Sequence, residues 1–206
     1  MVLDPGLPPR RGGLEEPDVA NGVALGGTNW PSSEMTLVAG PSTDLFFDPR
    51  TGHREDSAAI EVRVVEDEAF QLSARVLPEL LATFDAGVLL VRVDGDHWAK
   101  LCLEQATSGL PTAVSVVTRR LSDDANGWVL PAADAWLRIS RDRETFCFHV
   151  STDGQLWDLV RVFHLPAPGP VELGFLAQSP TGAGFTVAYS EIRYVPEALS
   201  DPRSRD

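Results

Sequence analysis

The sequence has few of the residues that build metal sites and disulfide frameworks. Its 206 residues include two cysteines and four histidines, and none of them forms a C-x-x-C pair or a Cys/His cluster with metal-ligand spacing. Cys102 and Cys147 each fall within a strand-like segment. We therefore expect two reduced, mostly buried thiols, as is typical of a cytoplasmic protein. We predict no bound metal and no cofactor.

Positive charge is also scarce. The 17 Lys and Arg residues stand against 30 Asp and Glu residues, which gives a formal net charge of −13. Such a chain is repelled by phosphate backbones and by anionic membrane surfaces. No apolar run approaches the ~20 residues that cross a bilayer, and prolines and acids interrupt the first twenty residues where a secretory signal needs an apolar core. The sequence therefore argues against nucleic-acid and membrane partners and favours a cytoplasmic location.

Long amphipathic helices are missing as well, and short strands take their place. Apolar residues alternate with period two at 59–65 and 70–76, while 87–93 is apolar on both faces and predicts a central strand. Further strand-like segments cover residues 98–104, 112–118, 135–141, 145–151, 157–163, 171–177 and 184–194. Their short connections predict an all-β sandwich or jelly roll of antiparallel sheets, with one short helical candidate at 78–84.

Composition divides the chain into three parts. Residues 1–20 are rich in Pro, Gly and charge and predict a flexible N-terminal arm. Residues 21–195 hold all the strand-like segments and predict one β-sandwich domain. Residues 196–206 are polar and proline-containing and predict a C-terminal tail.

The segment at 98–104 separates two chemically different faces. Its odd-numbered residues are Ala99, Leu101 and Leu103, which predict a face turned to the core. Its even-numbered residues place a tryptophan, a lysine and a glutamate in a row on the other face. A flat apolar ring beside fixed donors and acceptors suits a small polar ligand. The ligand-binding residues we predict are Trp98, Lys100, Glu104, Arg119 and Asp123. Arg138 and Arg141 have opposite parity, so at most one of them faces the same groove unless a bulge intervenes. The alternative is a Trp98 lid on the sheet edge with exposed Lys–Glu pairing.

Eight short motifs occur in an order that resembles one family. They are T-D-L-F at 43–46, F-D-A-G-V-L-L at 84–90, H-W-A-K at 97–100, V-S-V-V-T-R at 114–119, L-S-D at 121–123, W-L-R-I-S-R at 136–141, V-S-T-D-G-Q-L-W at 150–157 and L-A-Q-S-P-T-G-A-G-F at 176–185. Together, across roughly residues 30–194, they resemble the family of domains of unknown function grouped with the regulation of enolase protein. The resemblance implies an all-β, concanavalin A-like jelly-roll sandwich of two antiparallel sheets, one of them concave.

The chain departs from that family pattern at two positions. Asp124 follows the S-D motif where the family usually has an aromatic residue, and Phe46 stands where the family usually has a tryptophan. A pocket built on those aromatics would be altered here.

Acidic residues do not predict catalysis. The glucanases of the implied superfamily resemble one another in an E-x-D-x-E strand, whose spacing puts three carboxylates on one face. The acidic run here, Glu66-Asp67-Glu68, is contiguous and falls between two strands, which predicts a solvated loop. We therefore predict no catalytic residues and a non-catalytic domain that binds a carbohydrate-like or other small polar ligand in the concave groove, or a protein partner. The alternatives are a glycoside-active enzyme that uses Glu104 with an acid from the S-D motif, and an interaction scaffold without a groove ligand.

Overall fold

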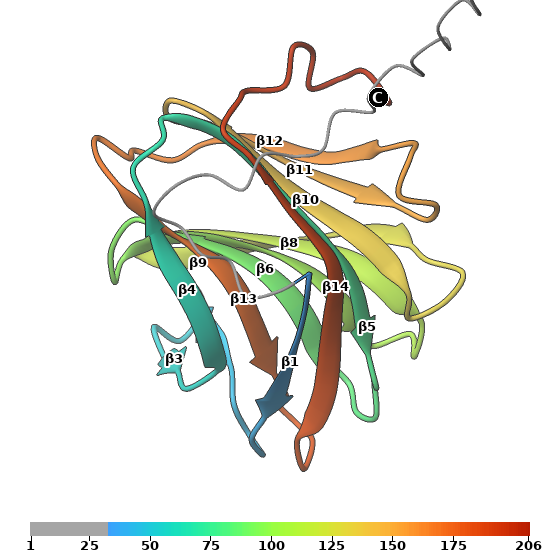
Figure 1. Cartoon of the computed structure of the whole chain (residues 1–206). Helices are drawn as coiled ribbons and strands as arrows, with labels where there is room; N and C mark the ends of the chain where they lie inside the picture. The colour runs from blue at the N-terminus through green and yellow to red at the C-terminus, as the bar shows by residue number, and fades with distance from the viewer. Residues whose placement is uncertain (1–32) are drawn as a thin grey trace, which may run out of the picture.

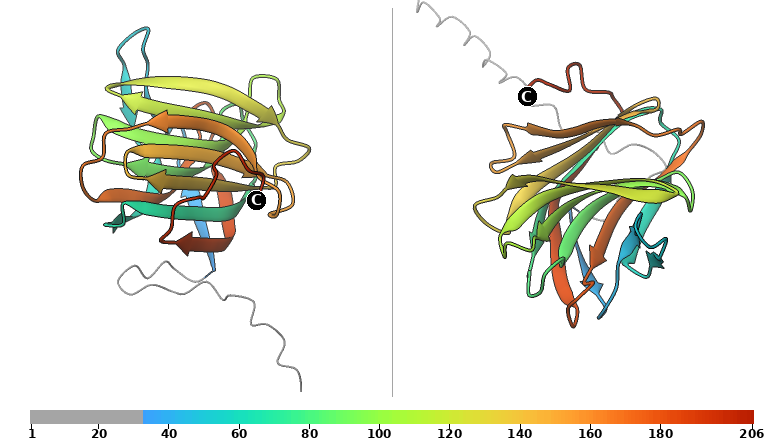
Figure 2. Two further views of the ribbon diagram at one scale, coloured as in Figure 1. Left: turned by 90° about the horizontal axis from the view of Figure 1, so that it is seen from above. Right: turned by 180° about the vertical axis from the view of Figure 1, so that it is seen from behind.

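The computed structural model describes residues 33–206 as two six-stranded antiparallel sheets packed face to face (Figures 1 and 2). The first sheet has the order β1 (Glu34–Ala39), β14 (Phe185–Val195), β5 (Ala69–Pro78), β10 (Ala135–Asp142), β11 (Thr145–Ser151) and β12 (Asp158–His164). The second has the order β4 (Ala59–Val65), β13 (Val171–Gln178), β6 (Ala86–Arg92), β7 (His97–Gln105), β8 (Pro111–Arg119) and β9 (Leu121–Val129). The predicted antiparallel sandwich is confirmed. No helix within residues 33–206 is long and apolar enough to cross a membrane.

The core lies between the two sheets and follows the period-two pattern of the sequence. In β5 every second side chain is buried, from Phe70 to Val76, as predicted. The two sheets pack closely at Gly87 of β6, where a Cβ atom would lie 2.6 Å from a methyl carbon of Val187 and 2.7 Å from one of Val76. A larger residue at this position would force the two sheets apart.

A second apolar cluster covers the face of the second sheet that points away from the core, called here the outer face. A small hairpin of β2 (Leu45–Phe47) and β3 (Arg54–Asp56) lies over this face. It buries Leu45 and Phe47 against apolar side chains of β6, β7 and β8. Strand β6 is therefore covered on both sides, as its continuous apolar sequence predicted.

Tyr189 ties the two sheets together. Its ring is buried in the core from β14, and its hydroxyl donates a hydrogen bond to the Leu176 carbonyl at 2.6 Å and accepts one from the Val88 amide at 2.9 Å. Val88 and Leu176 face each other across β6 and β13. The hydroxyl therefore bonds to two backbone groups of the opposite sheet and links β14 to β6 and β13.

The predicted hairpin at 145–163 is confirmed by the pairing of β11 with β12. Its turn places Gly154 at a φ of 72°, a backbone conformation that a residue with a side chain adopts at a cost. The ring of Trp136 lies directly against this glycine, because a Cβ atom there would be 3.0 Å from the indole. Both space and backbone conformation therefore require glycine at this turn.

Several elements differ from the sequence prediction. Strands β1, β2, β3 and β9 were not predicted, and the helical candidate at 78–84 is wrong. Those residues form a turn whose Leu81 and Ala82 amides donate to the Asp85 carboxylate at 3.0 and 2.8 Å. Strand β9 could not be predicted from apolar periodicity, because all its side chains except that of Ser122 are exposed at the sheet edge.

The C-terminal residues 196–206 pack against the first sheet. The Pro202 carbonyl lies 2.8 Å from the His149 Nε2 atom, and the Trp157 amide donates to the Arg205 carbonyl at 2.9 Å. The Arg138 guanidinium donates to the Asp206 carbonyl at 3.3 Å. The segment predicted as a tail thus covers buried polar side chains of β10 and β11. The predicted arm at 1–20 lies outside the described residues.

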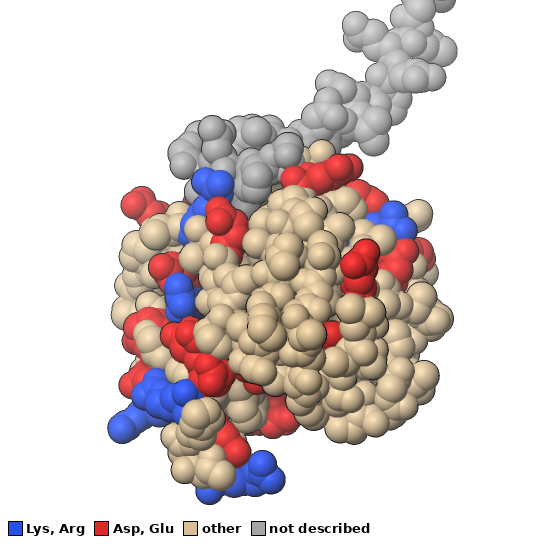
Figure 3. Space-filling model, turned by 90° about the horizontal axis from the view of Figure 1, so that it is seen from below, with Lys and Arg blue, Asp and Glu red and all other residues tan. Residues whose placement is uncertain are grey.

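Charged side chains are mixed on the surface. On the face seen from below, basic side chains sit beside acidic ones along one side, and a broad area carries few charges (Figure 3). Elsewhere in the described chain, Arg75 and Asp134 form an ion pair at 2.6 Å. This face presents no continuous basic surface of the kind that phosphate backbones bind.

Candidate functional site

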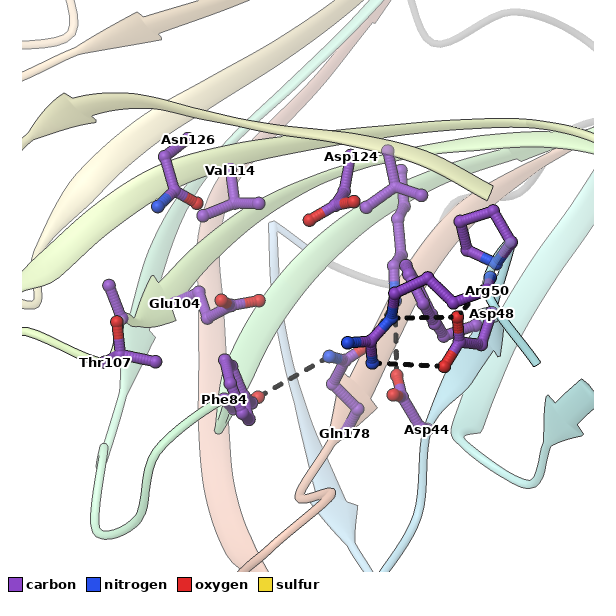
Figure 4. A pocket seen from close by; sticks show the side chains of 15 residues that line it. Asp44, Asp48, Arg50, Phe84, Glu104, Thr107, Val114, Asp124, Asn126 and Gln178 are labelled. Carbon is purple, nitrogen blue, oxygen red and sulfur yellow. Dashed lines mark hydrogen bonds and ion pairs between the residues drawn. The ribbon is translucent and has the colours of Figure 1, made fainter. Parts of the chain in front are cut away.

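The even-numbered side chains of β7 face away from the core, as predicted, and two of them line a pocket on the outer face (Figure 4). The pocket has a volume of about 500 Å³, within the ~300–1,000 Å³ of small-molecule sites. Strands β7, β8 and β9 form one side, and the β2–β3 hairpin forms the other. The lining residues are Asp44, Phe46, Asp48, Pro49, Arg50, Phe84, Lys100, Glu104, Ala106, Thr107, Val114, Val116, Asp124, Asn126 and Gln178.

Trp98 is part of the apolar cluster beneath the hairpin and does not line the pocket. Its side chain is 1% exposed and packs edge-to-face against Phe47, with ring centroids 5.4 Å apart. The structure therefore corrects its assignment as a ligand-binding residue. The sequence could not show this because strand β2, which covers the tryptophan, comes from a segment about fifty residues earlier in the chain.

Lys100 lines the pocket but its ammonium is already bonded. The side chain is 2% exposed. Its Nζ atom donates to the Leu45 carbonyl at 2.5 Å and the Gln178 side-chain oxygen at 2.6 Å, and lies 3.3 Å from the Asp44 carboxylate. An ammonium has three donors, and all three find acceptors within the protein. Lys100 therefore holds the hairpin segment onto the sheet and shapes the pocket.

Glu104 is the unusual group of the site. Its side chain is 8% exposed, and its carboxyl has no hydrogen bond or ion pair with any residue in the range 33–206. Burial raises the pKa of Glu104 to about 7; the Lys100 charge lowers it, and the Asp44 and Asp124 charges raise it further. Glu104 therefore exchanges a proton near neutral pH while it points into the cavity, which is typical of functional carboxyls.

Arg119 and Asp123 lie outside the pocket. The Arg119 guanidinium donates to the His164 carbonyl at 2.6 Å, and Asp123 forms an ion pair with Arg161 at 3.2 Å. Asp123 stands opposite Val117, whose side chain belongs to the core between the sheets. Asp123 therefore points away from the pocket. The acid of β9 that lines the pocket is the residue that follows it.

The pocket acid of β9 is Asp124. It stands opposite Val116, which lines the pocket. Asp124 and Phe46 are the two departures from the family pattern, and both line the pocket. The period-two rule, applied to residues 121–129, would have placed Asp123 and Asp124 on opposite faces of the sheet.

Arg138 and Arg141 do not reach the pocket either. Arg138 lies on β10 of the first sheet, with its guanidinium carbon 4.3 Å from the ring centre of Trp157. Arg141 is buried, and its guanidinium donates to backbone carbonyls, including that of Ala167 at 2.8 Å. Both arginines therefore stabilise loops and the C-terminal segment.

Phe84 is a pocket residue that the sequence did not indicate. Its φ of 72° is a costly conformation for a bulky residue, and it persists because the Phe84 amide donates to the Gln105 carbonyl at 2.8 Å. The Gln178 side-chain amide also approaches the Phe84 carbonyl, at 3.5 Å (Figure 4).

The lining can bind a polar ligand through several kinds of contact. Phe84 and Phe46 offer aromatic faces, Asn126 offers an amide, and the two acids offer oxygen acceptors. Within residues 33–206, no group of three or more His, Cys, Asp or Glu side chains is placed to hold a metal ion. Cys102 and Cys147 are free and buried, as predicted, and burial raises the pKa of both thiols.

We expect Trp98→Ala to lower the free energy of unfolding by ~3–5 kcal/mol, because it leaves a cavity beneath the hairpin. In a domain of this size the thermal midpoint should fall by more than ~6 °C. Trp128→Ala is the matched control, since that side chain is 52% exposed and its truncation should cost about 0.5 kcal/mol or less. Similar small shifts for both variants in thermal unfolding would contradict the assignment of Trp98 to the core.

We expect Glu104→Gln to change how stability depends on pH. Because the pKa of Glu104 is about 7 in the folded protein against an ordinary value of 4.5, the unfolded chain loses this proton first as the pH rises. The wild-type free energy of unfolding should therefore fall relative to that of the variant between pH 4.5 and 7, by up to about 3 kcal/mol, and then level off. Denaturant titrations across this range measure the effect. Glu66→Gln, in an exposed loop, is the control, and parallel curves for wild type and Glu104→Gln would refute the raised pKa.

Comparison with known proteins places the chain in a family. "Regulation of enolase protein 1" of Saccharomyces cerevisiae is 29% identical over 161 residues, covering 78% of this chain and 80% of that protein. A crystal structure of a functionally unknown protein from Saccharomyces cerevisiae superposes with a TM-score of 0.75 at 27% identity, covering 83% of this chain and 91% of that chain.

A xylan beta-1,4-xylosidase from Bacillus halodurans superposes with a TM-score of 0.60 at 14% identity, over 78% of this chain and 32% of that chain. This likeness shows the shared sandwich fold alone. Residues 27–197 match the model of a family described as proteins of unknown function, DUF1349. The chain belongs to this family.

Proposed function

We propose that this protein binds a small, polyhydroxylated, carbohydrate-like ligand in the outer-face pocket and does not catalyse its conversion. The observation that carries the proposal is the Glu104 carboxyl, buried and without a protein partner, at the wall of a pocket of about 500 Å³. No protein donor reaches the carboxyl oxygens, which are accessible from the pocket, so a bound ligand with hydroxyl groups would donate to them in place of water.

The rest of the lining supports a sugar-like ligand. Sugars combine an apolar ring face with polar edges, and the pocket combines both kinds of surface. Phe84 and Val114 offer apolar contact, while Asn126, Thr107 and Asp124 offer hydrogen-bonding groups at the rim. The hollow shape favours a small ligand over a protein partner, which requires a broader contact area.

Binding without catalysis is favoured by the arrangement on β7. Its outward positions carry Trp98, Lys100, Cys102 and Glu104, so this strand contributes a single carboxylate to the outer face. Lys100 is fully bonded within the protein and is not free to act on a ligand. The name of the yeast relative describes a regulatory role rather than a catalytic one, which agrees with this proposal.

A glycoside-active enzyme is the second candidate, and one observation favours it. Glu104, with its pKa near 7, shares the pocket with the exposed Asp124 carboxyl. Two carboxyls in different environments are what acid–base cleavage of a glycosidic bond requires. In this candidate Glu104 would protonate the leaving oxygen and Asp124 would activate water or attack directly.

Ligand-observed NMR with a panel of neutral and amino sugars tests the proposal. We expect saturation transfer to at least one panel member and its loss in Asn126→Trp, whose ring would fill the pocket from β9. Glu61→Trp, on an exposed position of β4, is the matched control and should keep binding. No transfer to any sugar would contradict the proposal. If the wild-type protein hydrolyses a glycoside of one of these sugars and Glu104→Gln does not, the result would support the second candidate instead.

A further inference from the structure

The charged side chains of the pocket fall into two groups. Those of the first group are paired within the protein. Lys100 lies 3.3 Å from Asp44, and Arg50 lies 3.3 Å from Asp48. Lys100 and Arg50 are the only cations of the lining. Because each is already paired with an aspartate, the lining offers no unpaired cation to an anionic ligand.

The second group is acidic and unpaired. Glu104 on β7 and Asp124 on β9 have no hydrogen bond or ion pair with any side chain or backbone group of the described chain. Figure 4 shows both carboxyls directed into the same space. The Glu104 side chain is 8% exposed, and its carboxyl oxygens are accessible from the pocket, where a ligand can reach them. The Asp124 charge also raises the pKa of Glu104, which places the two groups within electrostatic reach of each other.

The balance of these charges is negative. The pairs of Lys100 with Asp44 and Arg50 with Asp48 cancel, and they leave two carboxyls that repel each other when both ionise. A cation between them would remove this repulsion and supply donors to both. A neutral ligand would satisfy hydrogen bonds but would leave the charge in place.

Resting on the proposed function, we infer that the ligand carries a protonated amine held by Glu104 and Asp124, so that the pocket selects an amino sugar over its neutral counterpart. The Phe84 ring, which also lines the pocket, can contact an ammonium through its face. A divalent metal ion fits less well, because two free carboxyls fall short of the oxygen ligands that such ions require. The net charge of −13 further favours the approach of a cation.

The inferred ammonium makes binding depend on pH. The groups around Glu104 are Lys100 on its own strand, Asp44 beside the hairpin and Asp124 on β9. A bound ammonium adds positive charge to this set and therefore favours the ionised form of Glu104. Binding below pH 7 should release a proton from Glu104, and the affinity should rise with pH towards neutrality.

Calorimetric titration of the full chain with glucosamine, glucose and N-acetylglucosamine at pH 7 tests the inference. These probes share one ring and differ in the charged amine. We expect glucosamine to bind at least about tenfold more tightly than the other two, as charge-assisted hydrogen bonds allow. Asp124→Asn and Glu104→Gln should each reduce this preference. Asp123→Asn, which removes the neighbouring carboxylate that faces away from the pocket, should keep it.

The outcomes separate this inference from the proposed function. If glucose or N-acetylglucosamine binds as tightly as glucosamine or more tightly, the inference of a protonated amine is wrong, but the proposal of carbohydrate binding is unaffected. An unchanged preference in Asp124→Asn also overturns it, and this exposed position on β9 puts little of the fold at risk. Absence of binding by all three sugars and by the wider sugar panel contradicts both.

Discussion

The buried ammonium of Lys100 is the interaction on which the outer face depends. It comes from the middle of β7 and bonds to the Leu45 carbonyl and the Gln178 side chain, with Asp44 3.3 Å away. A cation taken out of water must be fully bonded or it destabilises the fold. Satisfying Lys100 therefore fixes the hairpin segment and the end of β13 against the sheet. The hairpin segment, held in this position, buries Trp98 and forms one side of the pocket.

The same arrangement explains why Glu104 remains without a partner. Glu104 lies four residues, or two repeats of the strand pattern, from Lys100 on the same face, yet the lysine is bonded to acceptors from other elements. The carboxyl is buried by the walls that Lys100 positions, and its pKa rises to about 7 for that reason. The strained Phe84 backbone and the exposed Asp124 complete a site whose free groups are acidic and aromatic.

The period-two pattern predicted the sandwich, most of its long strands and the two faces of β7, because alternation reports burial directly. It also placed Lys100 and Glu104 on the face away from the core, where both line the pocket. It failed where burial depends on distant segments: Trp98 is covered by β2, and Phe84 and Gln178 reach the pocket from other turns and strands. It did not reveal β9, because an exposed edge strand has no apolar period. Asp123 was predicted from the S-D motif, without the strand alternation that places Asp124 at the pocket.

The titration of Glu104 itself tests the proposal that this buried carboxyl binds a protonated amine. Its side-chain carboxyl carbon can be followed by NMR across pH and assigned by comparison with Glu104→Gln. We expect a midpoint near 7 in the free protein and a lower midpoint with saturating glucosamine. A midpoint near the ordinary ~4.3 of a solvated glutamate, unmoved by the amine, would contradict it.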